Sequence, residues 1–169
     1  MEDDRRLVAA ARAGSNDAVA RLFDRHWQGV WRAAYAVTGR CDLADDIAQD
    51  AFVRAIQALP TFDEERPIAP WLARIAVNRA IDILRRIRWI VVLDELEADA
   101  ADDPEPDEEL LRALLRLGWE RRTIVVLHYW IGYQLTDIAE ILDVPLGTVS
   151  SRLSRALADL REDLEETHG

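Results

Sequence analysis

The sequence predicts an all-α protein, with two small helical domains joined by an acidic linker. Three observations favour this fold class. Apolar residues recur at helical spacing in both halves of the chain, no stretch shows sustained strand alternation, and the segment between the halves lacks apolar periodicity. The 169 residues suffice for one domain or two small ones. We therefore expect domains at residues 1–92 and 107–169, joined by a linker at residues 93–106.

The first domain is expected to begin with two long helices. Ser15 is a typical N-cap for the first helix, and Gly39 marks its end. Between them, apolar residues recur at helical spacing: Val19, Leu22, Phe23, Trp27, Val30, Trp31 and Ala34. The second helix runs from Asp42 to Leu59 and ends before Pro60. Its apolar side is expected to contain Ile47, Ala51, Phe52, Ala55, Ile56 and Leu59.

A third helix is expected from Pro70, which suits a first helical turn, to Trp89. Its inward positions are Leu72, Ile75, Ala76, Ile83 and Ile87, and its polar face carries Arg74, Asn78, Asp82 and Arg85. Residues 70–90 contain five arginines and one acid, which makes them the most basic stretch of the chain. Such a face suits nucleic-acid phosphates, but an ordinary solvated face, with Asp82 paired to Arg79 or Arg86, explains it equally well. The segment "WIVVL" (89–93) is either a helix end or an extended exit.

The second domain ends in a helix-turn-helix pattern. The stretch "LTDIAEILDVPLGTVSSRLSRA" contains a short helix with Thr136 as a plausible N-cap, a tight turn, and a second helix. On the second helix the apolar stripe consists of Val149, Leu153, Ala156, Leu160 and Leu164. The opposite side is centred on Ser151 and Arg155, and short polar side chains there allow close approach to a major groove. A surface helix that meets only water is the alternative.

The charge is concentrated in one segment. The net charge is −11, with 32 acids against 21 basic residues, and every basic residue is arginine. Ten of the acids lie between Asp94 and Glu109, a segment without any arginine, and the rest of the chain is nearly neutral. The overall acidity therefore does not exclude a nucleic-acid partner for either domain.

The remaining composition predicts a cytoplasmic protein that is not an enzyme. The N-terminus lacks the apolar core of a signal peptide, and no apolar run is long enough to span a membrane. The single Cys41 excludes an internal disulfide and is interpreted as a small loop residue. His26, His128 and His168 show no metal-ligand spacing, and no phosphate loop or catalytic triad is present. We expect no cofactor and no metal, and a structural role for His128.

Taken together, these motifs resemble a bacterial extracytoplasmic-function (ECF) sigma factor with regions 2 and 4 joined directly. The resemblance is carried by "DLADDIAQDAFVRAIQALPTF", "PWLARIAVNRAIDILRR" and "LTDIAEILDVPLGTVSSRLSRALADLRE". It implies a specificity subunit that binds core RNA polymerase through the β′ clamp helices and the β flap. It also implies recognition of the −10 and −35 promoter elements, and an anti-sigma factor as a further partner.

The resemblance also assigns residues to these contacts. The polymerase-binding positions on the second helix are Asp45, Asp46, Gln49, Asp50 and Arg54. The loop Thr61–Ala69 and the following helix correspond to the part that captures a flipped base of the −10 element, with Phe62, Asn78, Arg79, Asp82, Arg85 and Arg86 as candidates. Trp71 is interpreted as a core residue. The −35 element is assigned to Thr148, Ser150, Ser151, Arg152, Ser154 and Arg155.

Two questions stay open at this point. Many members of the family have a lysine or arginine where this chain has Ser150, so the −35 preference can differ. The acidic linker either follows polymerase channels lined with basic residues or acts as a solubilising tether. A helix-turn-helix regulator that binds DNA without polymerase is the alternative function, but it leaves the first domain and its basic helix unexplained.

Overall fold

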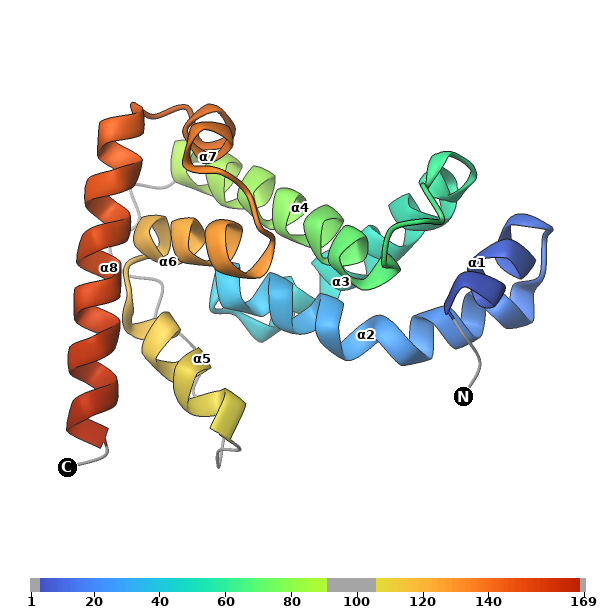
Figure 1. The fold of residues 1–169 in the computed structure, drawn as a ribbon, viewed down its shortest axis with the longest axis horizontal. Helices are drawn as coiled ribbons and strands as arrows, with labels where there is room; N and C mark the ends of the chain where they lie inside the picture. The colour runs from blue at the N-terminus through green and yellow to red at the C-terminus, as the bar shows by residue number, and fades with distance from the viewer. Residues whose placement is uncertain (1–3, 91–105, 168–169) are drawn as a thin grey trace. The chain divides into compact units, whose positions relative to one another are not determined.

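The computed structural model describes residues 4–90 and 106–167, which form helices and the turns between them (Figure 1). No β-strand occurs in these two ranges, and the all-α fold class is confirmed. The chain divides into two compact units, each of which is described by itself. Residues 91–105, which include nearly all of the expected linker and the end of "WIVVL", lie outside the described residues. Within the described ranges, no helix has the length and apolar character that a membrane span needs.

The first unit comprises residues 1–35 and 41–87 and is built from four helices. These are α1 (Asp4–Arg12), α2 (Asn16–Thr38), α3 (Cys41–Ala58) and α4 (Ile68–Ile90), with the short 3₁₀ helix η1 (Leu59–Thr61) after α3. The helix α1 was not expected from the sequence. The core is made largely of fully buried small and branched side chains: Ala44, Ile47, Ala48, Ala51, Ala76, Val77, Ala80 and Ile81. Such small side chains allow neighbouring helices to approach closely.

The ends of the helices in the first unit follow local capping rules. The Ser15 hydroxyl accepts a hydrogen bond from the Ala18 N–H at 3.2 Å, which confirms it as the N-cap of α2. Gly39 follows α2 with a φ of 68°, a conformation that glycine adopts without strain. Pro70 is in the first turn of α4, as expected. The loop assignment of Cys41 is wrong, because this half-buried residue begins α3.

The second unit contains the expected helix-turn-helix. Its elements are α5 (Pro106–Arg116), α6 (Trp119–Val125), the π-helical segment η2 (Val126–Trp130), α7 (Leu135–Leu142) and α8 (Leu146–Thr167). The buried side of α8 presents Val149, Leu153, Ala156 and Leu160 to a core that also includes Leu117, Ile124, Leu127 and Ile138. Arg121 is paired with Asp159, and Arg116 lies 3.5 Å from Asp163, so ion pairs join α5 and α6 to α8.

Two local details of the second unit are the N-cap of α7 and the contact of His128. The N-cap of α7 is Gln134 and not Thr136, because the Asp137 carboxylate accepts the Gln134 N–H at 3.2 Å and the helix starts two residues earlier than expected. His128 is half-buried and its Nδ1 lies 2.9 Å from the carbonyl oxygen of Tyr133, at the end of η2. This contact explains His128 as a structural residue.

Candidate nucleic-acid interfaces

The polar face of α4 exposes one row of side chains. Asn78, Asp82 and Arg86 are one helical turn apart and all three are exposed, whereas Arg74 and Arg85 are half-buried. Leu72, Ala76 and Val77 are buried on the other side, and Ile75, Ile83 and Ile87 lie half-buried at its edge. The row therefore offers an amide, a carboxylate and a guanidinium to a partner, and an amide can bond a base edge on both of its groups.

Arg79 is not paired within α4. Its Nε lies 2.6 Å from the Asp50 carboxylate on α3, so Arg79 pairs with this acid and not with Asp82, one of the alternatives that the sequence left open. The same carboxylate lies 3.0 Å from the Nε of Arg54. Asp50 thus connects the candidate polymerase face on α3 with the candidate DNA face on α4, and the side chain of Arg79 is only 23% exposed.

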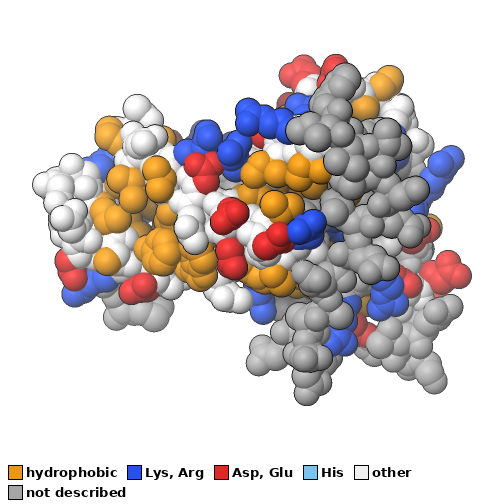
Figure 2. Space-filling view, turned by 180° about the vertical axis from the view of Figure 1, so that it is seen from behind, with side chains coloured by type: hydrophobic (Ala, Val, Ile, Leu, Met, Phe, Trp, Pro, Cys, Tyr) orange, Lys and Arg blue, Asp and Glu red, His pale blue; other side chains and the backbone are white. Residues whose placement is uncertain are grey.

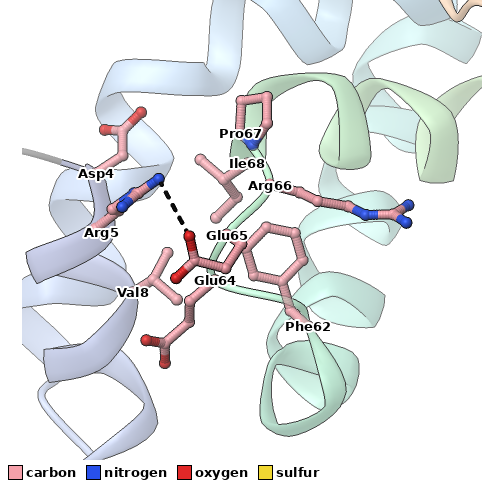
Figure 3. Close-up of a pocket in the computed structure, with 9 residues that line it drawn as sticks. All are labelled: Asp4, Arg5, Val8, Phe62, Glu64, Glu65, Arg66, Pro67 and Ile68. Carbon is pink, nitrogen blue, oxygen red and sulfur yellow. Dashed lines mark ion pairs between the residues drawn. The ribbon is translucent and has the colours of Figure 1, made fainter.

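The loop between η1 and α4 lies beside α1, and the two enclose a cavity of about 230 Å³ (Figure 3). The cavity is lined by Asp4, Arg5, Val8, Phe62, Glu64, Glu65, Arg66, Pro67 and Ile68. Phe62 is only 7% exposed, and its ring centroid lies 4.6 Å from that of Trp71. The Phe62 ring therefore packs inside the unit, whereas Trp71 is half-buried and lies at the border of the core and not within it. A base contact by Phe62 stays a prediction.

The candidate polymerase face of α3 is partly occupied by contacts within the unit. The Trp31 indole N–H donates to the Asp45 carboxylate at 2.7 Å, and Asp45, Asp46 and Gln49 are all exposed. Val53 and Ile56 continue the row of Gln49 and are 54% and 48% exposed. The expectation that Ile56 packs inward is therefore wrong.

Exposed apolar side chains on α2 and α3 were missed by the sequence reasoning. Figure 2 shows hydrophobic side chains gathered on the surface of the first unit. Phe23 on α2 is also exposed, and its ring lies 4.7 Å from that of Phe52. The helical spacing could have revealed this exposed apolar surface, because it places Val53 and Ile56 on the same side of α3 as the polar Gln49.

The helix-turn-helix turns sharply at Asp143. This residue has a φ of 53°, and among the described residues it is the one non-glycine with a positive φ. Its N–H bonds the carbonyl of Glu140, and the Thr148 N–H bonds that of Pro145 at 2.9 Å. The turn therefore closes α7 and starts α8 within a few residues, as the spacing predicts.

The reading face of α8 consists of exposed hydroxyls and one exposed guanidinium. The Ser151 hydroxyl donates to the Thr148 carbonyl at 3.1 Å, and the Ser154 hydroxyl donates to the Ser150 carbonyl at 3.0 Å. Both oxygens then offer lone pairs outward. Arg155 is exposed and pairs with no acid that the structure describes, whereas Thr148 and Ser150 are half-buried.

Arg152 differs from the rest of this face. Its Nη2 lies 2.8 Å from the Glu120 carboxylate on α6, and the two side chains are 28% and 27% exposed. The pair joins α8 to α6 and partly neutralises a cation assigned to DNA. Within the described residues, no group of His, Cys, Asp and Glu could hold a metal ion.

Both units match known domain families. The model of sigma-70 region 2 matches residues 22–90, and the model of sigma-70 region 4 matches residues 107–160. These matches define the class of protein as a sigma factor of RNA polymerase.

Similar proteins narrow the class. The ECF RNA polymerase sigma factor SigW of Bacillus subtilis is 30% identical over 181 residues, which cover 96% of this chain and 97% of SigW. SigM of Mycobacterium tuberculosis is 37% identical over 161 residues, which cover 93% of this chain and 82% of SigM. The chain belongs to the ECF RNA polymerase sigma factors. It is an alternative sigma factor that directs promoter recognition and transcription initiation, as a specificity subunit.

Solved structures agree with this assignment. The structure of CnrH in complex with the cytosolic domain of CnrY has a TM-score of 0.57 at 28% identity, covering 96% of this chain and 97% of CnrH. The sigma factor RpoE of Bartonella quintana, solved with the anti-sigma factor NepR, has a TM-score of 0.59 at 24% identity and shares the fold. It covers 86% of this chain and 96% of RpoE.

Proposed function

We propose that the first unit recognises the −10 element, the second unit recognises the −35 element, and α3 binds core RNA polymerase. The observation that carries this proposal is the presence of two exposed polar helix faces, one on α4 and one on α8, in separate helical units. The proposal keeps the domain limits expected from the sequence, with residues 93–106 as the linker. It also assigns the protein to the cytoplasm, where it meets polymerase.

At the −10 element, Asn78 bonds a base edge and Arg86 bonds a phosphate. Asn78 is exposed in the middle of the row, and an asparagine amide can both donate to and accept from a base. Arg85 and Arg79 are half-buried, and Arg79 already pairs with Asp50, so they support the phosphate contact from the edge of the face. Asp82, between Asn78 and Arg86, disfavours a phosphate close to the centre of the row and favours a base amino group there.

At the −35 element, α8 enters the major groove with its first turns. Ser151 and Ser154 use their hydroxyl protons within the helix, so their outward lone pairs accept from the amino groups of adenine or cytosine. Arg155 is the one long exposed cation on this face in the described part of the chain and bonds a guanine edge or a phosphate. Ser150 is half-buried, and its carbonyl accepts a hydrogen bond from Ser154. It therefore contributes little to DNA affinity.

Core polymerase binds the exposed row of α3. Asp46 and Gln49 supply polar contacts, and Val53 and Ile56 supply apolar surface beside them. Apolar area buried at the centre of such a contact contributes about 25 cal/mol per Å². Asp45, Asp50 and Arg54 are engaged within the unit and shape the rim of this surface. The β flap is proposed to bind the second unit.

Binding through two units explains how domains without a strong positive charge can still bind promoter DNA. Each unit binds its promoter element weakly, and attachment to one polymerase raises the effective concentration of the second contact. Two similar structures support a further partner, because CnrH was solved with the cytosolic domain of CnrY and RpoE with an anti-sigma factor. We include an anti-sigma factor among the proposed partners.

Run-off transcription tests the proposal. Core polymerase and this protein are combined on genomic fragments, the start sites are mapped, and the upstream sequences are aligned. We expect two conserved elements, and initiation only when the protein is present. A protein that binds the fragments but gives no promoter-dependent initiation with core polymerase would instead be a stand-alone regulator.

A further inference from the structure

We propose that Arg12, the last residue of α1, is the positioning residue that sets the conformation of the −10 recognition loop. The inference rests on the proposed role of the loop at residues 61–69. Arg12 lies outside residues 22–90, the range that the family model matches. Nothing in the residue pattern of the loop itself points to a partner on α1.

The Arg12 guanidinium bonds several acceptors of one short segment. Its Nε donates to the Leu59 carbonyl at 2.8 Å, and its Nη2 donates to the carbonyls of Phe62 and, at 3.4 Å, of Pro60. Its Nη1 bonds the Glu64 carboxylate. One side chain thus bonds three backbone carbonyls and one acid across 47 to 52 residues of sequence.

The acceptors lie at a place where a cationic donor is favoured. They follow the C-terminus of α3, where the last carbonyls of a helix have no partner within the helix and a cation is favoured by the helix dipole. Pro60 has no N–H of its own, and the Phe62 N–H already bonds Leu59 at 3.1 Å. The Leu59 carbonyl thus accepts from both Arg12 and the Phe62 N–H, and the guanidinium fork also supplies donors to the carbonyls of Pro60 and Phe62.

Arg12 is seated firmly enough to position the loop. Its side chain is 25% exposed, and α1 is anchored in the unit by Leu7 and Val8, each 2% exposed. Arg5, on the same helix, lies 3.8 Å from the Glu65 carboxylate, the pair drawn in Figure 3. The helix α1 therefore contacts the loop at Arg12 and again at Arg5.

Fixing the loop has a consequence for base recognition. The Phe62 carbonyl is bonded by Arg12 while the Phe62 ring packs on Trp71, so the start of the loop is restrained on both sides. At the far end of the loop, buried Ile68 begins α4, the helix that carries Asn78. A loop restrained in this way loses little conformational freedom when it binds the −10 element. Its shape is therefore set before binding, and this favours the matching bases over others.

The test compares Arg12 variants on promoters with an altered −10 element. The promoter that initiates best in run-off transcription is prepared with each −10 base replaced in turn. Open-complex formation by holoenzyme is then measured on the original and the altered promoters. The variants are Arg12→Ala, Arg12→Lys and, as a matched control, Arg6→Ala, which removes an exposed arginine from the same helix. Thermal unfolding and binding to core polymerase are measured for each variant.

We expect the preference for the original −10 bases to fall about tenfold in Arg12→Ala, the loss typical of charge-assisted hydrogen bonds. Arg12→Lys keeps the charge but not the fork, so it is expected to restore the preference only partly. Glu64→Gln, which leaves the three carbonyl bonds in place, gives a smaller loss. Arg6→Ala leaves the preference unchanged.

Two outcomes would overturn the inference. One is an unchanged base preference in a folded Arg12→Ala protein. The other is an equal loss on all promoters that follows weakened core binding, because this indicates a purely structural role. Failure of the proposed function is distinguishable, since the unaltered protein would then give no promoter-dependent initiation at all.

Discussion

Replacing Glu120 with glutamine tests whether the fold restrains a cation of the recognition helix. Glu120 is 2.8 Å from Arg152, and both side chains are about three-quarters buried. The ion pair contributes about 0.5–1 kcal/mol after solvent screening, and an acid in the first turn of α6 adds about 0.3–1 kcal/mol. We expect Glu120→Gln to lower the free energy of unfolding by about 1 kcal/mol.

The same substitution is expected to strengthen DNA binding. Arg152 loses its partner and becomes available for a phosphate, which steepens the slope of log K against log salt by about 0.9. The assay is holoenzyme binding to a promoter fragment at several salt concentrations, together with thermal unfolding of the free protein. Glu162→Gln is the matched control, because it removes the same charge from an exposed position farther along α8.

General damage to the fold would weaken DNA binding. We instead expect Glu120→Gln to be less stable and yet to bind DNA more tightly and with a stronger dependence on salt. If Glu120→Gln and Glu162→Gln have the same salt slope, Arg152 does not reach DNA and the pair with Glu120 serves the fold alone. If Glu120→Gln binds more weakly than the unaltered protein, the ion pair positions α8 for DNA, and the reasoning is refuted.

Three further predictions concern single side chains. Arg155→Ala should reduce transcription from promoters that depend on the −35 element by about tenfold, with core binding intact; equal activity on all promoters would count against its role. Asn78→Ala should impair open-complex formation in proportion to the match of the −10 element, and unaltered open complexes would remove Asn78 from the site. Asp143→Gly should raise the free energy of unfolding by about 0.5 kcal/mol, because glycine adopts a φ of 53° without strain, while Asp143→Ala should lower it. Denaturant unfolding of both Asp143 variants measures this, and a destabilised Asp143→Gly would contradict the strain argument.

The helices and their order could be predicted because the signals are local. Ser15 caps α2, Pro70 is in the first turn of α4, and the apolar stripe of α8 packs inward as its spacing indicates. Gln134 caps α7 in place of Thr136, since the Asp137 carboxylate can bond the earlier N–H equally well. The two candidate caps are two residues apart, and the choice between them is a choice between similar local interactions.

The candidate site was predicted less completely, because residue type identifies a polar face but not its partners. The row of Asn78, Asp82 and Arg86 is exposed as its spacing suggests. Arg79 has the same chemistry as Arg86 but lies against Asp50 of α3. Val53 and Ile56 have the composition of core residues, yet they are exposed, since α3 is covered on its other side by enough apolar surface to complete the core.

The sequence by itself determined the all-helical fold, the helix-turn-helix and the family, because helical period, capping and motif order act over a few residues. Only the tertiary structure decided how the cations are used. Arg12 bonds the loop after α3, Arg79 forms an ion pair with Asp50, and Arg152 forms one with Glu120, each across a distance in sequence that no spacing rule covers. The physical reason is that an ion pair depends on where two helices bring their side chains, and this is fixed by the packing of the core between them.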